Sequence, residues 1–178
     1  MPDLFEQLVG DYLTGKGYLC NFNVSYRKAD GRGAGSDIDV LAMRQTPPHD
    51  VIVGECKSWE VGVRGQRMVD NPAHTDRRYF KPLFEEEWAD GLAAKVREEF
   101  GQKKGSTYVI YCARLRDDGD ALRKRRVAGN RVQVVTLDEM IRDTNQRLDD
   151  KQNHSVEPTT LGRFVQLMRH AGIKLEFP

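Results

Sequence analysis

Two short stretches of this sequence place charged side chains at the ends of apolar segments. SDIDVLAM holds Asp37 and Asp39, and VIVGECK ends in Glu55 and Lys57. Two carboxylates with room for water suit Mg²⁺, which prefers one or two carboxylate ligands and keeps much of its hydration shell. A lysine beside such an ion can position or help deprotonate an attacking water, while the ion polarises a phosphoryl oxygen. These side chains predict phosphodiester hydrolysis.

Both stretches have the apolar composition of buried strands, and the adjacent prolines of RQTPPH between them suit a turn. Residues two apart on a strand share a face, so Glu55 and Lys57 point together while Cys56 points away. If the strands form a hairpin, the carboxylates of Asp39 and Glu55 converge beside the Lys57 ammonium. The alternative for Glu-x-Lys is an exposed ion pair of little energetic consequence.

The elements around these stretches set the expected fold. Apolar residues at three- and four-residue spacing in PDLFEQLVGDYLTGKGY predict a helix capped by Asp3. Alternation in CNFNVSYRK predicts a strand that buries Phe22, Val24 and Tyr26 on one face. Further predicted elements are a helix over 83–100, strands over 106–115 and 131–137, and helices over 138–148 and 159–173. The polar stretch 145–158 is expected to be an exposed linker.

Short links between the first three strands favour an antiparallel meander, and the helix over 83–100 favours a crossover to a parallel neighbour. We therefore expect an α/β fold with a mixed central sheet flanked by helices, in the order α-β-β-β-α-β-β-α. Residues 1–150 are expected to form the core domain. Residues 151–178 would supply a linker and a helix that packs on the same domain.

From residue 4 to about residue 59 the chain resembles the core of the PD-(D/E)XK nuclease superfamily, the restriction-endonuclease-like fold. It is most similar to the Holliday-junction-resolvase-like and Mrr-like branches. Family members have a helix bearing a glutamate, an aspartate leading an aliphatic strand, and Glu-x-Lys ending the next strand. Here LFEQLVGDYLTGKGY supplies Glu6, SDIDVLAM the aspartate and VIVGECKSW the triplet. The sequence departs from the family in having Ile38 before Asp39, where many members have proline, and in its long connector between the strands.

The resemblance implies a metal-dependent endodeoxyribonuclease that acts in repair, recombination or defence, with Mg²⁺ as cofactor and Mn²⁺ as a substitute. It implies metal binding by Asp39, Glu55 and the backbone carbonyl of Cys56, water orientation by Lys57, and support from Glu6. Family members place the aspartate directly before the aliphatic run, which favours Asp39 over Asp37. The alternative is a non-catalytic nucleic-acid-binding or scaffold subunit with a nuclease-like fold.

DNA is the expected partner, although the formal net charge is only +1. No sequence-reading module is evident, so target specificity would come from DNA shape, a homodimer or a partner protein. The basic and amide residues expected to contact DNA are Arg32, Gln66, Arg77, Arg78, Lys81, Arg123, Lys124, Arg125 and Arg126. The alternative for such clusters is an ordinary solvated surface.

The bulk properties of the 178-residue chain fit a globular protein, with 39% hydrophobic and 31% charged residues. Its three cysteines lie far apart, which predicts free thiols and neither a disulfide framework nor a zinc knuckle. The sequence has no apolar run of membrane-spanning length, and its start lacks the plan of a signal peptide. A cytoplasmic protein with no membrane partner is therefore expected.

Overall fold

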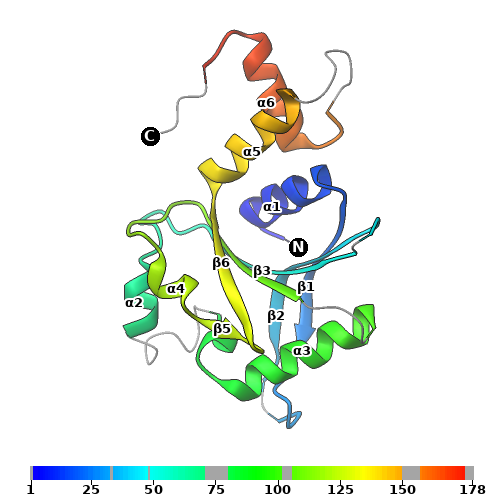
Figure 1. Cartoon of the computed structure of the whole chain (residues 1–178), viewed down its shortest axis with the longest axis vertical. Coiled ribbons are helices and arrows are strands. Elements are labelled where there is room, and N and C mark those ends of the chain that lie inside the picture. The colour runs from blue at the N-terminus through cyan, green and yellow to red at the C-terminus, as the bar shows by residue number, and fades with distance from the viewer. Residues whose placement is uncertain are drawn as a thin grey trace.

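A six-stranded sheet with helices on both faces forms the centre of the protein (Figure 1). The computed structural model describes residues 2–32, 34–47, 49–70, 80–101, 106–149 and 157–174. The strands are β1 (Tyr18–Tyr26), β2 (Ser36–Arg44), β3 (Val51–Lys57), β4 (Ser106–Cys112), β5 (Arg126–Val127) and β6 (Asn130–Thr136). Their order in the sheet is β1-β2-β3-β4-β6-β5. The predicted α/β class with a mixed central sheet is confirmed.

The topology follows the connections that the sequence predicts. β1, β2 and β3 form an antiparallel meander, in register through Val24 with Ile38 and Val40 with Gly54. The chain then crosses through α3 (Glu86–Phe100) to β4, which lies parallel to β3, and β6 lies parallel to β4. The short strand β5, which the sequence did not predict, pairs antiparallel with the edge of β6.

Two layers of helices cover the sheet (Figure 1). On one face lie α1 (Leu4–Gly15), α5 (Leu137–Asp149) and α6 (Thr160–His170), whose apolar residues form a core with Val40 and Tyr111. On the other face α3 is joined by α2 (Gly65–Asp70), the 3₁₀ helix η2 (Lys81–Leu83) and α4 (Asp120–Arg123). That second core includes Trp88 and Leu92 of α3 packed with Leu41 and Val53 of the sheet. No helix among the described residues is both long and apolar enough to span a membrane.

Helix α1 begins at a reciprocal cap, as the sequence predicts for Asp3. The Glu6 N–H donates to Asp3 Oδ1 at 2.8 Å, and the Asp3 N–H donates to Glu6 Oε2 at 3.0 Å. This capping box satisfies two amide groups that the first helical turn would otherwise leave unpaired. It also fixes where Glu6 stands on α1, and therefore where its carboxylate meets the sheet.

The predicted single buried face of β1 is wrong, because the strand changes face at Asn23. Phe22 packs with the core under α1, whereas Val24 and Tyr26 pack with the core under α3. Asn23 has φ of 52°, the left-handed region that asparagine tolerates better than most residues. A residue in that conformation interrupts the two-residue alternation, so side chains on either side of it point to different layers.

The predicted helix over 138–148 is present as α5, whereas the exposed linker predicted over 145–158 is wrong where the structure describes it. Helix α5 continues to Asp149, and Glu157 is buried with its side chain 0% exposed. Arg147 Nη1 donates to Glu157 Oε1 at 2.8 Å, which ties the end of α5 to the segment before α6. Residues 150–156 lie outside the described residues.

Candidate functional site

Strands β2 and β3 separate at one point, which we name the fork. Their ladder ends where Val40 pairs with Gly54, so the next residues toward the fork, Asp39 and Glu55, stand opposite each other. Each strand keeps its outer neighbour beyond that point, because β2 still pairs with β1 through Ser36 and β3 with β4 through Lys57. The fork therefore places two carboxylates in an opening within an otherwise continuous sheet.

The Asp39 side chain supplies the hydrogen-bond acceptor that the backbone of β2 would provide if the β2–β3 ladder continued past Val40 and Gly54. Its Oδ2 accepts a hydrogen bond from the Cys56 N–H at 2.7 Å. In a strand the N–H and C=O of one residue point to the same edge. The Cys56 carbonyl therefore also faces the fork, consistent with the next carbonyl, that of Lys57, accepting from Ala113 at the other edge at 3.0 Å.

Glu55 and Lys57 form a buried ion pair between Glu55 Oε1 and Lys57 Nζ. Their side chains are 10% and 11% exposed, so the alternative of a solvated surface pair does not apply. Burial of a charge costs free energy unless the charge is paired, which explains why these two groups meet. The remaining Glu55 oxygen and Asp39 Oδ1 accept no hydrogen bond from any described residue.

At the fork two buried carboxyl groups, those of Asp39 and Glu55, lie near a single cation, Lys57. Burial, and then the nearby charge of Glu55, raise the pKa of Asp39 to about 7. Burial also raises the pKa of Glu55, against the opposing effect of Lys57. Burial alone would lower the pKa of Lys57, but Glu55 and Asp39 outweigh it and the pKa is raised. Additional positive charge at the fork would lower the pKa of both carboxyl groups.

Glu6 reaches the same region from α1. Burial raises its pKa, the capping bond from Asp3 lowers it, and the charge of Asp39 raises it further. A side-chain hydrogen bond with Asn23 also lowers it, which places the Asn23 amide beside Glu6. Asn23 lies between Phe22, which pairs with Val40, and Val24, which pairs with Ile38, so it is level with Asp39 at a position where the β1–β2 ladder has no pair. Sequence reasoning missed Asn23, and its only signal there is an asparagine inside an apolar alternation.

Asp37, the alternative to Asp39, belongs to another environment. It is exposed, and its Oδ1 accepts from Ser25 Oγ at 2.7 Å across the β1–β2 pair. The structure thus brings Asp39, Glu55, Lys57 and Glu6 together and leaves Asp37 outside this group.

The donor set at the fork fits a hard divalent cation. No group of three or more His, Cys, Asp and Glu side chains that could hold a metal occurs in the part of the chain that the structure describes. Asp39 and Glu55 instead offer two carboxylates with oxygens to spare, and the Cys56 carbonyl faces them. Mg²⁺ is commonly held by one or two carboxylates with water completing its octahedron. The residues present therefore suit Mg²⁺ or Mn²⁺.

The thiol of Cys56 is not a reactive group here. Burial, followed by the charges of Asp39 and Glu55, raises its pKa far above the ordinary thiol range. The side chain packs with the core under α1. Because the thiolate is the nucleophilic form, the triplet acts through its carboxylate, its amine and its backbone.

The residues expected to contact DNA lie on several elements. Arg32 is exposed in the β1–β2 loop, and Gln66 on α2 donates to Asp70 at 2.7 Å. Lys81 Nζ lies 4.4 Å from the centre of the Trp88 ring. Arg77 and Arg78 lie outside the described residues.

The stretch from Arg123 to Arg126 is divided between α4 and the edge strand β5. Arg123 donates to the Asp118 carbonyl and Arg126 to the Gly129 carbonyl, while Arg125 lies over the Phe84 ring and Lys124 is exposed. In the sheet, β4 and β6 separate β5 from β3. A DNA contact by these residues remains a prediction.

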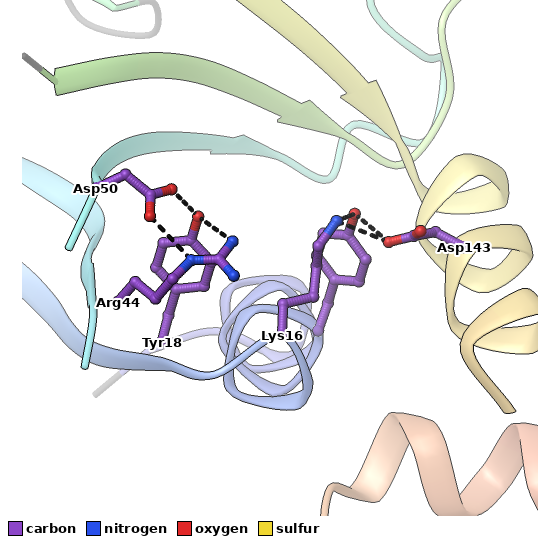
Figure 2. Close-up of polar contacts among 6 residues, drawn as sticks. Lys16, Tyr18, Arg44, Asp50 and Asp143 are labelled. Carbon is purple, nitrogen blue, oxygen red and sulfur yellow. Dashed lines mark hydrogen bonds and ion pairs between the residues drawn. The ribbon is translucent and has the colours of Figure 1, made fainter. Parts of the chain in front are cut away.

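A second polar group lies at the other end of β3, where Figure 2 shows two networks. Lys16 Nζ donates to Asp143 at 2.9 Å and to the Tyr12 hydroxyl at 3.1 Å. In the other network Arg44 donates to both Asp50 and the hydroxyl of Tyr18. Each cation has its own aspartate, so the two networks are balanced in charge. They tie α1 to α5 and the start of β1 to the β2–β3 turn.

Comparisons of the chain with protein-family models, with curated proteins and with solved structures gave no match. The function is therefore inferred from the side chains at the fork and from the motif that the sequence carries.

Proposed function

We propose that the chain is a metal-dependent endodeoxyribonuclease with a restriction-endonuclease-like fold and that the fork is its reaction centre. The observation that supports this most strongly is the meeting of Asp39 from β2 with Glu55 and Lys57 from β3. Glu6 approaches from α1, as the sequence motif leads one to expect. The antiparallel meander followed by a helical crossover is consistent with the same proposal.

Each residue at the fork has a role that its environment allows. Asp39, Glu55 and the Cys56 carbonyl would hold Mg²⁺, or Mn²⁺ as a substitute. Such an ion supplies polarisation of a phosphoryl oxygen and a lowered pKa for bound water. Because its pKa is raised, Lys57 stays protonated at neutral pH and donates hydrogen bonds to a water or a phosphate oxygen. Glu6, beside the Asn23 amide, would accept a hydrogen bond from water at the edge of the site.

Incubation of the purified protein with supercoiled, linear, single-stranded and four-way-junction DNA, with Mg²⁺, Mn²⁺ or EDTA, tests this proposal. The informative variants are Asp39→Asn and the double variant Glu55→Gln/Lys57→Met, both of which keep side-chain size. Asp90→Asn, an exposed aspartate on α3, is the matched control. Cutting that needs the metal, survives in the control and is lost in the other two supports the nuclease.

Cutting by Asp39→Asn at the parental rate would contradict the proposed metal site. No cutting of any substrate by a folded parental protein would instead favour a non-catalytic nucleic-acid-binding subunit. If cutting then appeared on addition of a second protein, specificity would come from that partner. Sedimentation of the same preparations would show whether a homodimer forms.

A further inference from the structure

A positively charged cavity of about 430 Å³ opens beside the end of β3. Trp59, Val61 and Met68 supply its apolar surface. Its charged surface comes from the guanidinium groups of Arg64, Arg67 and Arg116. We name this the arginine cavity. Its volume falls in the range of sites that enclose a small ligand of nucleotide size.

The three arginines have no acidic partner among the residues that the structure describes. No ion pair joins Arg64, Arg67 or Arg116 to a described carboxylate. All three are exposed, and no described acidic residue lines the cavity. Charge of one sign within a concave surface attracts an anion of the opposite sign.

The nearest acidic residue along the chain from Arg116 is used for structure. Asp117 accepts hydrogen bonds from the N–H groups of Gly65, Gln66 and Gly119 at 3.0, 3.1 and 3.1 Å. Its carboxylate therefore fixes the start of α2 against the loop after β4, and it forms no ion pair with the three arginines.

The loops that build the arginine cavity are held together by their backbones. Val63 N–H donates to the Arg114 carbonyl and Arg116 N–H to the Val63 carbonyl, both at 2.8 Å. Gly62 has φ of 75°, and a Cβ there would stand 2.9 Å from Cγ of Arg116. Glycine thus lets the turn after Trp59 lie directly against Arg116, so Trp59 and the arginines share one cavity.

The arginine cavity adjoins the fork because Trp59 follows Lys57 by two residues. Two residues of extended chain span at most about 7 Å. That distance is about two steps of a stacked DNA strand, at roughly 3.4 Å per base, and fewer steps of an extended strand. A strand whose phosphate lies at Lys57 would therefore have an adjacent nucleotide within reach of Trp59.

We propose that the arginine cavity binds an unpaired nucleotide next to the phosphate that is cut, with its base against Trp59 and its neighbouring phosphates on the arginines. The proposal rests on the proposed function, since it takes the strand at the fork to be the substrate. Aromatic side chains combined with a basic groove are the usual means of binding single strands, because every base has a face that can stack. The substrate would then be single-stranded or branched DNA.

A continuous duplex does not fit this arrangement equally well. Its bases are stacked on one another and paired, so none can lie against Trp59 without leaving the helix, which costs free energy. The duplex backbone could contact the arginines from outside, but no base would then contact the apolar side chains of the cavity. Binding should therefore be stronger for DNA that offers an unpaired base.

Fluorescence anisotropy of a labelled oligothymidylate and of a blunt duplex of equal length, both in EDTA, tests the inference without cleavage. Trp59→Ala is expected to weaken binding of the single strand by about tenfold, and Trp59→Phe to restore most of it. Arg116→Gln should weaken it and lower its salt dependence by about one phosphate contact. Arg97→Gln, an exposed arginine near Tyr108 of β4, is the control and should leave affinity unchanged.

Quenching of tryptophan fluorescence gives a second readout. The chain has two tryptophans, and Trp88 is only 4% exposed, so quenching by oligothymidylate should come from Trp59. Circular dichroism confirms that each variant is folded, and Arg116→Gln keeps the test valid if Trp59→Ala unfolds.

The outcomes separate this inference from the proposed nuclease. A parental protein that cuts DNA while Trp59→Ala and Arg116→Gln bind single strands normally, or while duplex binds as tightly, overturns the inference alone. Selective single-strand binding with no cutting overturns the nuclease and leaves the arginine cavity as a DNA site. Absence of any binding overturns the inference.

Discussion

At the scale of the residue, Lys57 and Glu55 depend on each other because both are buried. Removing one partner of a buried pair leaves an uncompensated charge, so Lys57→Met should lower the free energy of unfolding by about 3–5 kcal/mol. The double variant Glu55→Gln/Lys57→Met should recover most of that loss. Urea unfolding at neutral pH measures both values, and a double variant no more stable than Lys57→Met would mean that the two side chains do not stabilise each other.

Asp39 makes stability depend on pH in an unusual direction for a carboxylate. Its pKa is raised from an ordinary 3.8 to about 7, so the folded state binds more protons between those values than the unfolded state. The stabilising contribution of Asp39 is therefore complete below about pH 4 and is lost as the pH rises through about 7.

Asp39→Asn, which can still accept the Cys56 hydrogen bond, should remove this dependence. Its stability relative to the parent should rise from about pH 4 to about pH 8, by at most on the order of 4 kcal/mol. Urea unfolding across that range tests the change, with Asp90→Asn as control. A difference that is flat with pH, or that falls, would show that Asp39 titrates normally.

The meeting of Glu55 with Lys57 could be predicted because a two-residue period needs no tertiary information, whereas Glu6 and the choice of Asp39 over Asp37 came from the resemblance to the nuclease superfamily. Glu55 and Lys57 share a face in any strand, and they pair in the structure. Asn23 could not be predicted, since a polar residue between Phe22 and Val24 reads as the exposed position of a regular strand. Its left-handed conformation, with φ of 52°, and its side-chain hydrogen bond with Glu6 are visible only in the structure.

At the scale of the element, the change of face in β1 depends on that conformation. Asn23→Gly should fold as well as the parent, because glycine adopts positive φ without steric cost. Asn23→Val should lose about 1–2 kcal/mol, since a left-handed conformation is costly for other L-residues and worse for a β-branched one. Asn21→Val, at an exposed β1 position, is the control. Equal stability of the two valine variants in urea would contradict the assigned conformation.

The docking of α3 depends on Gly91. A Cβ at this position would stand 1.9 Å from the Arg27 carbonyl oxygen, a backbone atom at the end of β1 that has little freedom to move. Gly91→Ala should therefore destabilise the protein by about 1–3 kcal/mol despite better helix propensity. At Gly15 the nearest atoms belong to the Arg147 side chain, which can shift more readily than backbone, so Gly15→Ala should cost less. Thermal unfolding of the two variants gives the comparison, and equal midpoints would argue against the close contact.

The elements with strong periodicity were predicted and the weakly patterned ones were not. The apolar stripe in 4–15 predicted only a helix and the apolar runs in 36–44 and 51–57 predicted only strands, and all three elements are present. The polar stretch at the end of α5 was predicted both as the end of a helix and as the start of a linker, because Leu148 alone shows its apolar side, and the structure is helical there. The fork was out of reach for a different reason: where a ladder ends is decided by neighbouring strands and leaves no mark in the sequence.

At the scale of the whole molecule, the acids of the fork oppose folding when they are ionised, and a cation would reverse this. Burial raises the pKa of both Asp39 and Glu55, and the charge of Glu55 raises that of Asp39 further, which is a cost of the folded state at neutral pH. A ligand that binds only the folded state stabilises it in proportion to the logarithm of its concentration. Metal binding at the fork should therefore appear as a change in global stability, even without DNA.

Mg²⁺ is accordingly expected to raise the midpoint of thermal unfolding, and more at about pH 8 than at about pH 5.5, because protons compete for the same carboxylates. At a hundredfold excess over Kd the gain is about 2.7 kcal/mol. For a chain of this size that corresponds to about 2–4 °C for each kcal/mol. Differential scanning calorimetry with Mg²⁺ or EDTA measures it. Asp39→Asn should abolish the shift and Asp90→Asn should keep it, whereas an equal shift in both would place the ion elsewhere on the surface.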